Sequence, residues 1–393
     1  MDVLRLNTST FIPDTLVEGY NSMIWTERYL GNGEFELKTT KVSETKALIP
    51  EGQLITLRDT KEVMIVESHS ITRSDENNSE LTVKGRSFET CTEHRAIVSL
   101  LYNKPWTTIK KYKTSEVSAM LLWNAIVNPT IEDITTQTIS RFAEDAIPQV
   151  VITDSSNFVD TVKDWTLKSG YVYPQVLDFL ILGKFGIRNI RPSNTSGNVI
   201  TFDATQTTTR GNLQKVLTSN IPQLRVDVYD GYDRTRQQTV LIPIIFYYNA
   251  GHIISPQYLF SDKDYKNTGL LSYPNVNGSY GRIWVLPNPP ASGLNRKTLY
   301  EDAGDRGDQV DPAYTDGLFQ KIRVELGKHK KTVMFDGAIS PISPYKYNVD
   351  YFLGDKVTLM AEYGVDLAMF VSEYIRTEDS TGDRGYPTLI LAS

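Results

Sequence analysis

The sequence has one cysteine and four histidines among its 393 residues. Cys91 has no partner for an intramolecular disulfide, which excludes a disulfide-stabilised scaffold and fits synthesis in a reducing cytoplasm. The histidines stand far apart, with no His-Glu-x-x-His motif and no cysteine neighbours. We therefore expect neither a zinc site nor any other cofactor. The four histidines are His69, His94, His252 and His329.

Long apolar runs are also missing. The longest, residues 240–248, contains Pro243 and is far too short to cross a bilayer. The first five residues, MDVLR, lack a basic region followed by an apolar core, so we expect no signal peptide. The sequence thus predicts no membrane segment.

An excess of positive charge is absent. The chain has 41 basic and 47 acidic residues, a net charge of −6. A surface that neutralises phosphates needs clustered lysine and arginine, so stable nucleic-acid binding is disfavoured. Tyrosine, in contrast, is frequent, with 22 residues, which is typical of half-buried strands and, alternatively, of subunit interfaces.

Known catalytic and phosphate-binding motifs are missing as well. Residues 277–281 (NGSYG) depart from a nucleophile elbow because the first glycine is displaced, and their surroundings predict a loop between strands. Residues 354–358 (GDKVT) lack the glycine-rich run that surrounds a phosphate and predict a β-turn. We therefore expect no enzyme activity and no catalytic, cofactor-binding or metal-binding residues.

Two possibilities for acidic residues stay open. The loop from Asp302 to Asp311 could bind calcium through its carboxylates, but its spacing is not that of a helix-loop-helix site and favours a solvated loop. Its Arg306-Gly307-Asp308 tripeptide matches a cell-adhesion motif that is too short to carry weight. A glycosidase-type pair among the 47 acids is not testable from sequence, which does not give the separation of carboxylates.

What the sequence does contain is mostly strand patterning. Residues 22–29 and 34–38 alternate around Gly31-Asn32-Gly33 and predict a hairpin. A second hairpin is predicted for 53–57 and 62–67, and a third strand for 80–84 after a polar loop at 73–79. We expect Gly85 to end that strand and Ser87 to cap a helix from Phe88. These strands would form one wall of an N-terminal barrel.

Helical periodicity follows. Helices are predicted at 117–127 after Thr114-Ser115-Glu116, at 158–168 with Gly170 as its C-terminal cap, and at 174–184. A fourth should begin at Pro312 and end at Gly327. Strands are predicted at 187–190, 198–202, 225–229, 240–248, 332–335, 356–360 and 368–375. No repeat of fixed period appears, so a solenoid or propeller is unexpected.

Three blocks of the sequence together resemble the siphophage tail-hub family, which is related to the hub of contractile phage tails and to the base of type VI secretion spikes. The blocks follow one another in the order found in that family. They are residues 23–29, 33–37, 62–67 and 83–89; then 250–253, Tyr258, Ser261 and 264–267; then 347–358 and 375–379.

This resemblance implies an α+β, predominantly β fold in which two barrel-like β domains flank an inserted mixed α/β domain. The implied ranges are 1–100 for the N-terminal barrel, 101–325 for the mixed middle region and 326–393 for strands of a second barrel. Three chains would form a ring at the virion tail tip with pseudo-sixfold symmetry. Its implied partners are the distal tail protein, the tape measure protein and a receptor-binding or fibre protein.

The resemblance leads to a structural virion protein that forms the tail hub and a conduit for DNA ejection. One alternative is a tail-associated cell-wall-degrading enzyme. Another is a receptor- or carbohydrate-binding module that uses tryptophan surfaces, although most tryptophans lie in apolar patterns typical of core positions. The five are Trp25, Trp106, Trp123, Trp165 and Trp284.

Overall fold

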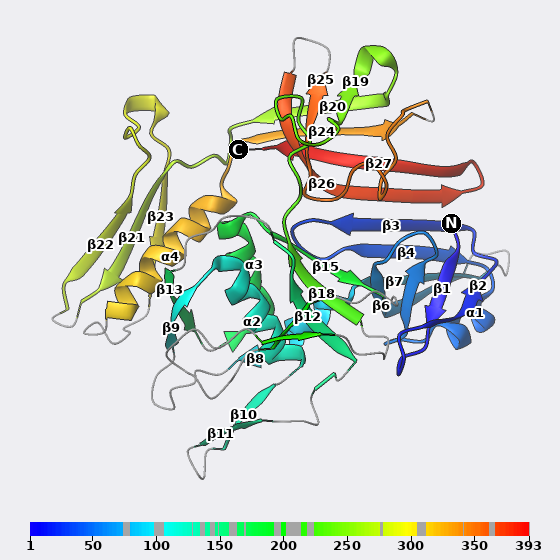
Figure 1. Cartoon of the computed structure of the whole chain (residues 1–393), viewed down its shortest axis with the longest axis horizontal. Coiled ribbons are helices and arrows are strands. Elements are labelled where there is room, and N and C mark those ends of the chain that lie inside the picture. Colours follow the sequence, from blue (N-terminus) through cyan, green and yellow to red (C-terminus); the bar gives the residue numbers. More distant parts are fainter. Residues whose placement is uncertain are drawn as a thin grey trace.

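The computed structural model describes most of the chain in sixteen stretches. They are residues 1–73, 79–97, 106–127, 129–133, 138–141, 146–147, 149–156, 163–168, 170–191, 198–201, 214–217, 224–275, 278–304, 312–340, 342–360 and 366–392. A sheet of 13 strands runs through two β units, and a mixed region and a small arm pack beside it (Figure 1). The predicted α+β, predominantly β fold is confirmed.

The first unit holds the N-terminal strands in the spatial order β2-β1-β5-β6-β7-β4-β3. Strand β4 alternates buried and more exposed side chains, as half-buried strands do, whereas β5 is buried throughout, and the core of the unit packs Trp25 on Phe35. The elements are β1 (Val3–Leu6), β2 (Pro13–Val17), β3 (Ser22–Arg28), β4 (Glu34–Thr39), α1 (Val42–Leu48), β5 (Leu54–Leu57), β6 (Val63–Arg73) and β7 (Ser79–Ser87).

The middle region surrounds two helices, α2 and α3, that pack on each other beside a three-stranded sheet, β12-β18-β15. The elements are η1 (Phe88–His94), β8 (Ala96–Ile97), β9 (Trp106–Tyr112), α2 (Thr114–Ile126), β10 (Thr130–Asp133), β11 (Thr138–Arg141), β12 (Val150–Asp154), β13 (Lys163–Lys168), β14 (Gly170–Tyr171), α3 (Val172–Gly183), β15 (Gly186–Ile190), β16 (Asn198–Thr201), β17 (Gln214–Leu217) and β18 (Leu224–Tyr229).

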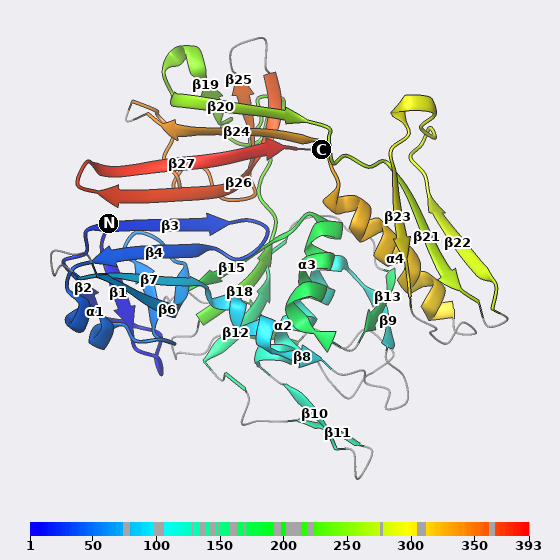
Figure 2. The same ribbon diagram turned by 180° about the vertical axis from the view of Figure 1, so that it is seen from behind.

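The second unit continues the large sheet in the order β26-β27-β24-β20, with β25 paired to β26 and β19 paired to β25. Seen from behind, β26 runs directly alongside β3 of the first unit (Figure 2). The elements are β19 (Ile245–Tyr247), η3 (Tyr248–Ala250), β20 (Ile253–Ser261), β24 (Thr332–Ile339), β25 (Lys356–Met360), β26 (Asp366–Asp379) and β27 (Gly382–Leu391).

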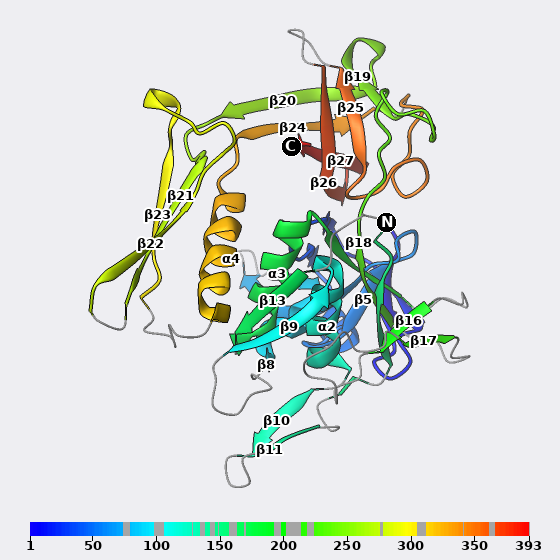
Figure 3. The same ribbon diagram turned by 60° about the vertical axis from the view of Figure 1, so that its left-hand side comes forward.

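The arm is inserted between β20 and β24 and has its own small core. In it, α4 packs with one face against a three-stranded sheet, β22-β21-β23, and also lies beside α3 of the middle region (Figure 3). Lys328 of α4 pairs with Asp178 of α3 at 3.5 Å. The elements are β21 (Thr268–Pro274), β22 (Tyr280–Val285), η4 (Gly293–Asn295), β23 (Thr298–Asp302) and α4 (Pro312–Lys328). Among the residues that the structure describes, no helix is long and apolar enough to cross a membrane.

Three predictions about secondary structure are wrong. Residues 163–168 of the predicted helix 158–168 form strand β13, and Gly170 lies in β14 instead of capping a helix. Of the strand predicted at 240–248, only β19 forms, and Val240 and Ile242 are exposed. Only the part of the run after Pro243 pairs with another strand, β25, which fits the inability of proline to donate to a sheet.

Gly85 does not end β7, which continues to Ser87. A Cβ atom on Gly85 would lie 1.8 Å from the carbonyl oxygen of Ile65 and 2.6 Å from the Phe35 ring. The glycine is therefore present because backbone and ring approach it closely, not because the strand stops. Ser87 is the N-cap of a 3₁₀ helix, η1, but its hydroxyl makes no capping bond.

Candidate functional site: a sheet joint built on an internal repeat

The two β units share one topology. In the first, β5-β6-β7-β4-β3 lie side by side through antiparallel pairs. In the second, β25-β26-β27-β24-β20 lie in the same spatial and sequential order, again antiparallel. Each unit has a sixth strand, and the two differ in direction. Strand β1 runs antiparallel to β5, whereas β19 runs parallel to β25. The chain thus contains a structural duplication.

The turn before β5 and the turn before β25 match in detail. Gly52 and Gly354 both have φ of 84°, and each donates its N–H to the next strand, to Val66 and Val371 respectively, at 2.8 Å. The segments that follow are Gly52-Gln53-Leu54-Ile55-Thr56-Leu57 and Gly354-Asp355-Lys356-Val357-Thr358-Leu359. The β-turn predicted at 354–358 is therefore confirmed only at its start, because strand β25 already begins at Lys356.

A β-bulge occurs at the same place in both units. In β6 the pairing with β7 shifts between Val66 and Ser68, and in β26 the pairing with β27 shifts between Val371 and Glu373. A bulge fixes the register on both sides of it. The two units can therefore be matched residue by residue, with Ser68 equivalent to Glu373.

The units join edge to edge where β3 pairs with β26, in a segment that we call the joint. It runs from Arg28 opposite Glu373 to Met23 opposite Glu378. The Tyr29 N–H donates to the Ser372 carbonyl at 2.8 Å and extends the ladder by one step. The first and third blocks of the family resemblance meet here, although they are far apart in the sequence.

Charged side chains hold the joint on both of its faces, with Arg28 on the outer face and Arg376 opposite Trp25 on the inner one. The Arg28 guanidinium donates to Glu373 Oε1 at 2.8 Å, to Glu34, and to the carbonyl oxygen of Asn32 at 2.9 Å. Arg376 pairs with Asp59 at 2.7 Å. Planar guanidinium groups suit such multiple contacts because their donors are fixed in direction. The joint is therefore a specific contact and not only a continuation of backbone hydrogen bonds.

The inner side of the joint buries an unusual carboxylate. Glu27 is 5% exposed, and it accepts hydrogen bonds from the Tyr347 hydroxyl at 2.6 Å and from Trp25 Nε1 at 3.2 Å. Burial raises the pKa of Glu27 even though both hydrogen bonds lower it. Burial and the nearby Glu27 carboxylate raise the pKa of Tyr347. The pair stabilises the joint by a hydrogen bond that requires a protonated tyrosine.

Two more carboxyl groups lie in this region, Glu62 near Glu27 and Glu89 near Glu62. Burial, followed by the charges of Glu27 and Glu89, raises the pKa of Glu62 well above its ordinary value. Burial also raises the pKa of Glu89, which is 2% exposed. Like charges in a poorly solvated place oppose one another's ionisation, so this group of three makes the region sensitive to pH.

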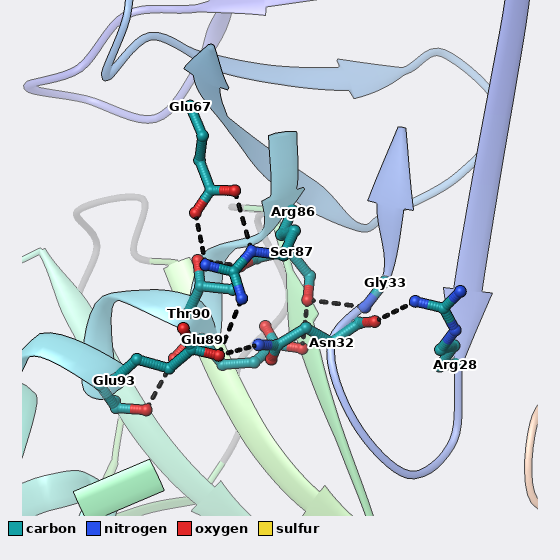
Figure 4. Close-up of polar contacts among 10 residues, drawn as sticks. Arg28, Asn32, Gly33, Glu67, Arg86, Ser87, Glu89, Thr90 and Glu93 are labelled. Carbon is teal, nitrogen blue, oxygen red and sulfur yellow. Dashed lines mark hydrogen bonds and ion pairs between the residues drawn. The ribbon is translucent and has the colours of Figure 1, made fainter. Parts of the chain in front are cut away.

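A polar network connects this region with the middle region (Figure 4). Arg86 binds Glu67 through two bonds of 2.8 and 2.9 Å and reaches Glu93 of η1 at 2.9 Å. The Glu93 carboxylate also accepts from Asn32 Nδ2 at 2.9 Å. Because Asn32 lies in the β3–β4 turn that Arg28 contacts, the network links η1 to the joint. The bond to Glu67 is the main cause that raises the Arg86 pKa.

Asn189 on β15 fixes the middle region to the first unit. Its Nδ2 donates to Glu89 Oε2 at 2.7 Å, and its Oδ1 accepts from the Val63 N–H at 2.5 Å. The Ser87 hydroxyl donates to the other Glu89 oxygen at 2.9 Å and accepts from the Gly33 N–H at 3.0 Å. Each buried polar side chain of this inner contact thereby has hydrogen-bond partners, as buried polar groups require.

The residues considered from sequence lie elsewhere. His69 contacts the Ile49 carbonyl and Glu51, whereas His252 and His329 contact the carbonyls of Ile245 and Asp264. No group of three metal-binding side chains was found in the described stretches. In the acidic loop, Asp302 ends β23, and Asp305, Asp308 and Asp311 fall outside the described residues. Ser279 precedes β22 in a hairpin, as predicted for 277–281.

Sequence reasoning missed the groups that build the joint. Nothing local marks Glu27 and Glu89 as buried or Glu62 as half-buried, because a single glutamate in a strand or turn pattern is ordinarily exposed. One available signal was the similarity of residues 52–57 to 354–359, which share glycine, threonine and leucine at equal spacing. That similarity would have indicated two related units.

The same overall geometry occurs in known proteins. A family model described as "Siphovirus ReqiPepy6 Gp37-like protein" matches residues 4–386. The tail protein from Neisseria meningitidis MC58 shares 10% identity at a TM-score of 0.55, covering 100% of this chain and 96% of its own. The prophage MuSo2 43 kDa tail protein from Shewanella oneidensis shares 11% identity at a TM-score of 0.52, covering 100% and 98%. At such identities the likeness shows a shared fold. No match was found among curated proteins.

Proposed function

The chain belongs to the Siphovirus ReqiPepy6 Gp37-like protein family, and we propose that within the phage tail it forms the hub at the tail tip. Family membership confirms the predicted relation to tail proteins of long-tailed phages. The proposed role is structural. The hub would join the tail tube and the distal tail protein to host-recognition parts, without catalytic turnover.

The observation that carries the proposal is the duplication together with the joint. Each chain supplies two β units of one topology, already joined edge to edge. Three chains would supply six such units, which is the number needed to face a sixfold tube. Closed cyclic assemblies arise when one surface binds a different surface of the next copy. The joint provides a model for that contact.

Charge supports a role as a DNA conduit. With 41 basic against 47 acidic residues, the chain offers no general excess of positive charge to retain phosphates. A ring that DNA passes through gains from weak contact with it, since each retained phosphate would slow passage. The tape measure protein and a receptor-binding or fibre protein are the further proposed partners.

Size-exclusion chromatography with light scattering tests the hub. We expect trimers at high concentration, or on addition of distal tail protein. A chain that stays monomeric under both conditions would contradict the proposal. Zymography on host peptidoglycan tests the enzymatic alternative, and a cleared band lost on substitution of one carboxylate would favour a cell-wall-degrading enzyme instead.

One observation favours a second candidate, a receptor- or carbohydrate-binding surface on the arm. Trp25, Trp123 and Trp165 are buried, as predicted for core positions, but Trp284 is 44% exposed. Trp284 and Tyr300 flank Leu270 from the two neighbouring strands, and Arg296 lies 5.0 Å from the Trp284 ring. Such aromatic faces stack on sugars. Glycan-array binding that is lost in Trp284→Ala, with Trp106→Ala as a comparison, would support it.

A further inference from the structure

We propose that residues 257–261 of β20 pair with residues 68–72 of β6 in a second copy of the chain, antiparallel and in the register of the joint. The proposal rests on the proposed ring, and it names the two surfaces that would close it. It follows from the internal repeat, because the joint already pairs the equivalents of these two segments within one chain.

Each unit has two edges of different kinds. The joint uses the β3 edge of the first unit and the edge of β26 beyond its bulge in the second. The equivalent edges are β20 in the second unit and β6 beyond its bulge in the first. In the described structure, β20 pairs only with β24, and residues 68–73 pair only with β7. One edge of each kind is thus left over per chain, as a head-to-tail ring requires.

The register follows from the matched pairings. Val66 and Val371 lie opposite Gly85 and Leu389, which lie opposite Phe35 and Phe335. Those phenylalanines in turn lie opposite Trp25 and Tyr258. Tyr258 therefore corresponds to Trp25, and Ile71 to Arg376, which faces Trp25 in the joint. The expected pairs between copies are Ser68 with Ser261, His69 with Phe260, Ser70 with Leu259, Ile71 with Tyr258, and Thr72 with Gln257.

Exposed apolar side chains lie where this pairing would cover them. Ile71 is 52% exposed although it lies opposite the buried Leu81, and Phe260 is 58% exposed two residues from Tyr258. In the joint, the equivalent of Phe260 is Glu27, which is only 5% exposed because β26 covers it. Pairing between copies would bring Ile71 and Phe260 to diagonal positions on one face, within reach of each other.

Both segments lack charged side chains, which commonly protect an edge strand, while Pro256 and the bulge between Ile254 and Gln257 lie just before the second segment. Residues 68–72 (SHSIT) and 257–261 (QYLFS) contain no lysine, arginine or acid. Native sheets usually guard exposed edges with such charges, so an unguarded edge fits a partner strand. The joint, in contrast, contains Arg28, Glu27, Glu373 and Arg376. This difference in charge would keep a free segment from replacing a strand of the joint, because an uncharged edge would leave the charged side chains of the joint strand unpaired.

Disulfide trapping tests the register. In the joint, Tyr29 and Ser372 form a hydrogen-bonded pair, so by alternation Thr26 and Ile375 form a non-hydrogen-bonded one. Their equivalents, Leu259 and Ser70, would have Cα atoms about 4.5 Å apart, within disulfide range. Both side chains are exposed, so cysteine should not disturb either unit. Thr72 and Gln257 form the next such pair.

The same four positions supply the controls. Under mild oxidation, S70C/L259C and T72C/Q257C should give covalent trimers on non-reducing gels, whereas the exchanged combinations S70C/Q257C and T72C/L259C should not. Native Cys91 competes poorly, because burial raises its pKa to about 12. If light scattering finds a trimer but the in-register pairs fail to cross-link, or the exchanged pairs cross-link as well, the register is wrong and the hub stands. A monomer in every condition, with no cross-link, overturns both.

Discussion

At the scale of single residues, the region around the joint depends on groups that are held in unusual environments. Glu27 and Glu89 are almost fully buried carboxyls with raised pKa values, and Asn189 bridges Glu89 to a backbone N–H. Gly85 lies opposite the bulge of β6. These residues lie where the first unit contacts the second unit and the middle region. Substitutions at them test what their unusual environments contribute to stability.

Gly85→Ala should destabilise the first unit by about 1–3 kcal/mol, the usual cost of overpacking a filled core. The new methyl group would meet the Ile65 carbonyl oxygen, which belongs to the ladder and cannot move aside cheaply. Urea unfolding followed by tryptophan fluorescence measures the loss. The neighbouring exposed Lys84→Ala is the control and should change stability far less. Equal effects of the two would contradict the close-approach explanation.

Glu62→Gln should stabilise the protein at neutral pH. The folded-state pKa of Glu62 is raised above its ordinary value of 4.5, so the folded chain holds this proton more tightly than the unfolded chain. The free energy of unfolding therefore falls as pH rises from 4.5 through the raised pKa, by about 1.4 kcal/mol for each pH unit that separates the folded-state pKa from the unfolded-state pKa. Glutamine removes this loss.

Thermal unfolding between pH 4.5 and neutrality measures the effect. The difference between Glu62→Gln and the wild type should be largest at the high end and vanish at the low end. Glu44→Gln on α1, which is exposed, is the matched control. A gain that is independent of pH would show that burial of charge at Glu62 is not its cause.

At the scale of elements, helices and strands differ in how far their own sequence explains them. α4 follows its amphipathic pattern, with Leu318 and Ile322 buried against the arm sheet. α2 is buried almost all round, so the single apolar face predicted for it understates its burial. Strand β13 has a helical pattern but pairs with β9, because tertiary pairing overrides a weak local preference.

Ile322→Ala should destabilise the arm by about 2–5 kcal/mol, as expected for a cavity in a small core. Ile322 is fully buried and lies so close to β21 that a Cβ on Gly269 would be 2.7 Å from it. Hydrogen exchange should become faster in α4 and β21–β23 first, because these share a core separate from that of the second unit. Phe319→Ala, at a position 37% exposed, should have little effect. Faster exchange spread evenly over the chain would contradict a separate arm.

At the scale of the whole molecule, the central feature is one sheet shared by two units of the same topology. The duplication gives each chain a joint, and in the part of the chain that the structure describes β20 pairs only with β24 and residues 68–73 only with β7. The predicted boundaries at residues 100 and 325 stay a prediction. The large sheet also takes β19 and β20 from within the range predicted as the middle region.

The assembled protein should not retain duplex DNA. Specific retention relies on several phosphate contacts by lysine and arginine, and the net charge of −6 disfavours them. An electrophoretic mobility assay at about 50 mM salt, where phosphate contacts are strong, should show no shift for the trimer. A shift that disappears as salt rises would reveal a basic surface and contradict a low-affinity conduit.

The sequence by itself determined the alternating strands, the hairpins β3–β4 and β5–β6, the existence of α2, α3 and α4, and the absence of a disulfide framework. These depend on periodicity and turn chemistry within a few residues, which local sequence specifies. Only the tertiary structure decided the joint, the buried carboxylates and the free edges. Arg28 and Glu373 are 345 positions apart. No local sequence pattern predicts that residues so far apart lie on paired strands, because strand pairing depends on how the whole chain packs.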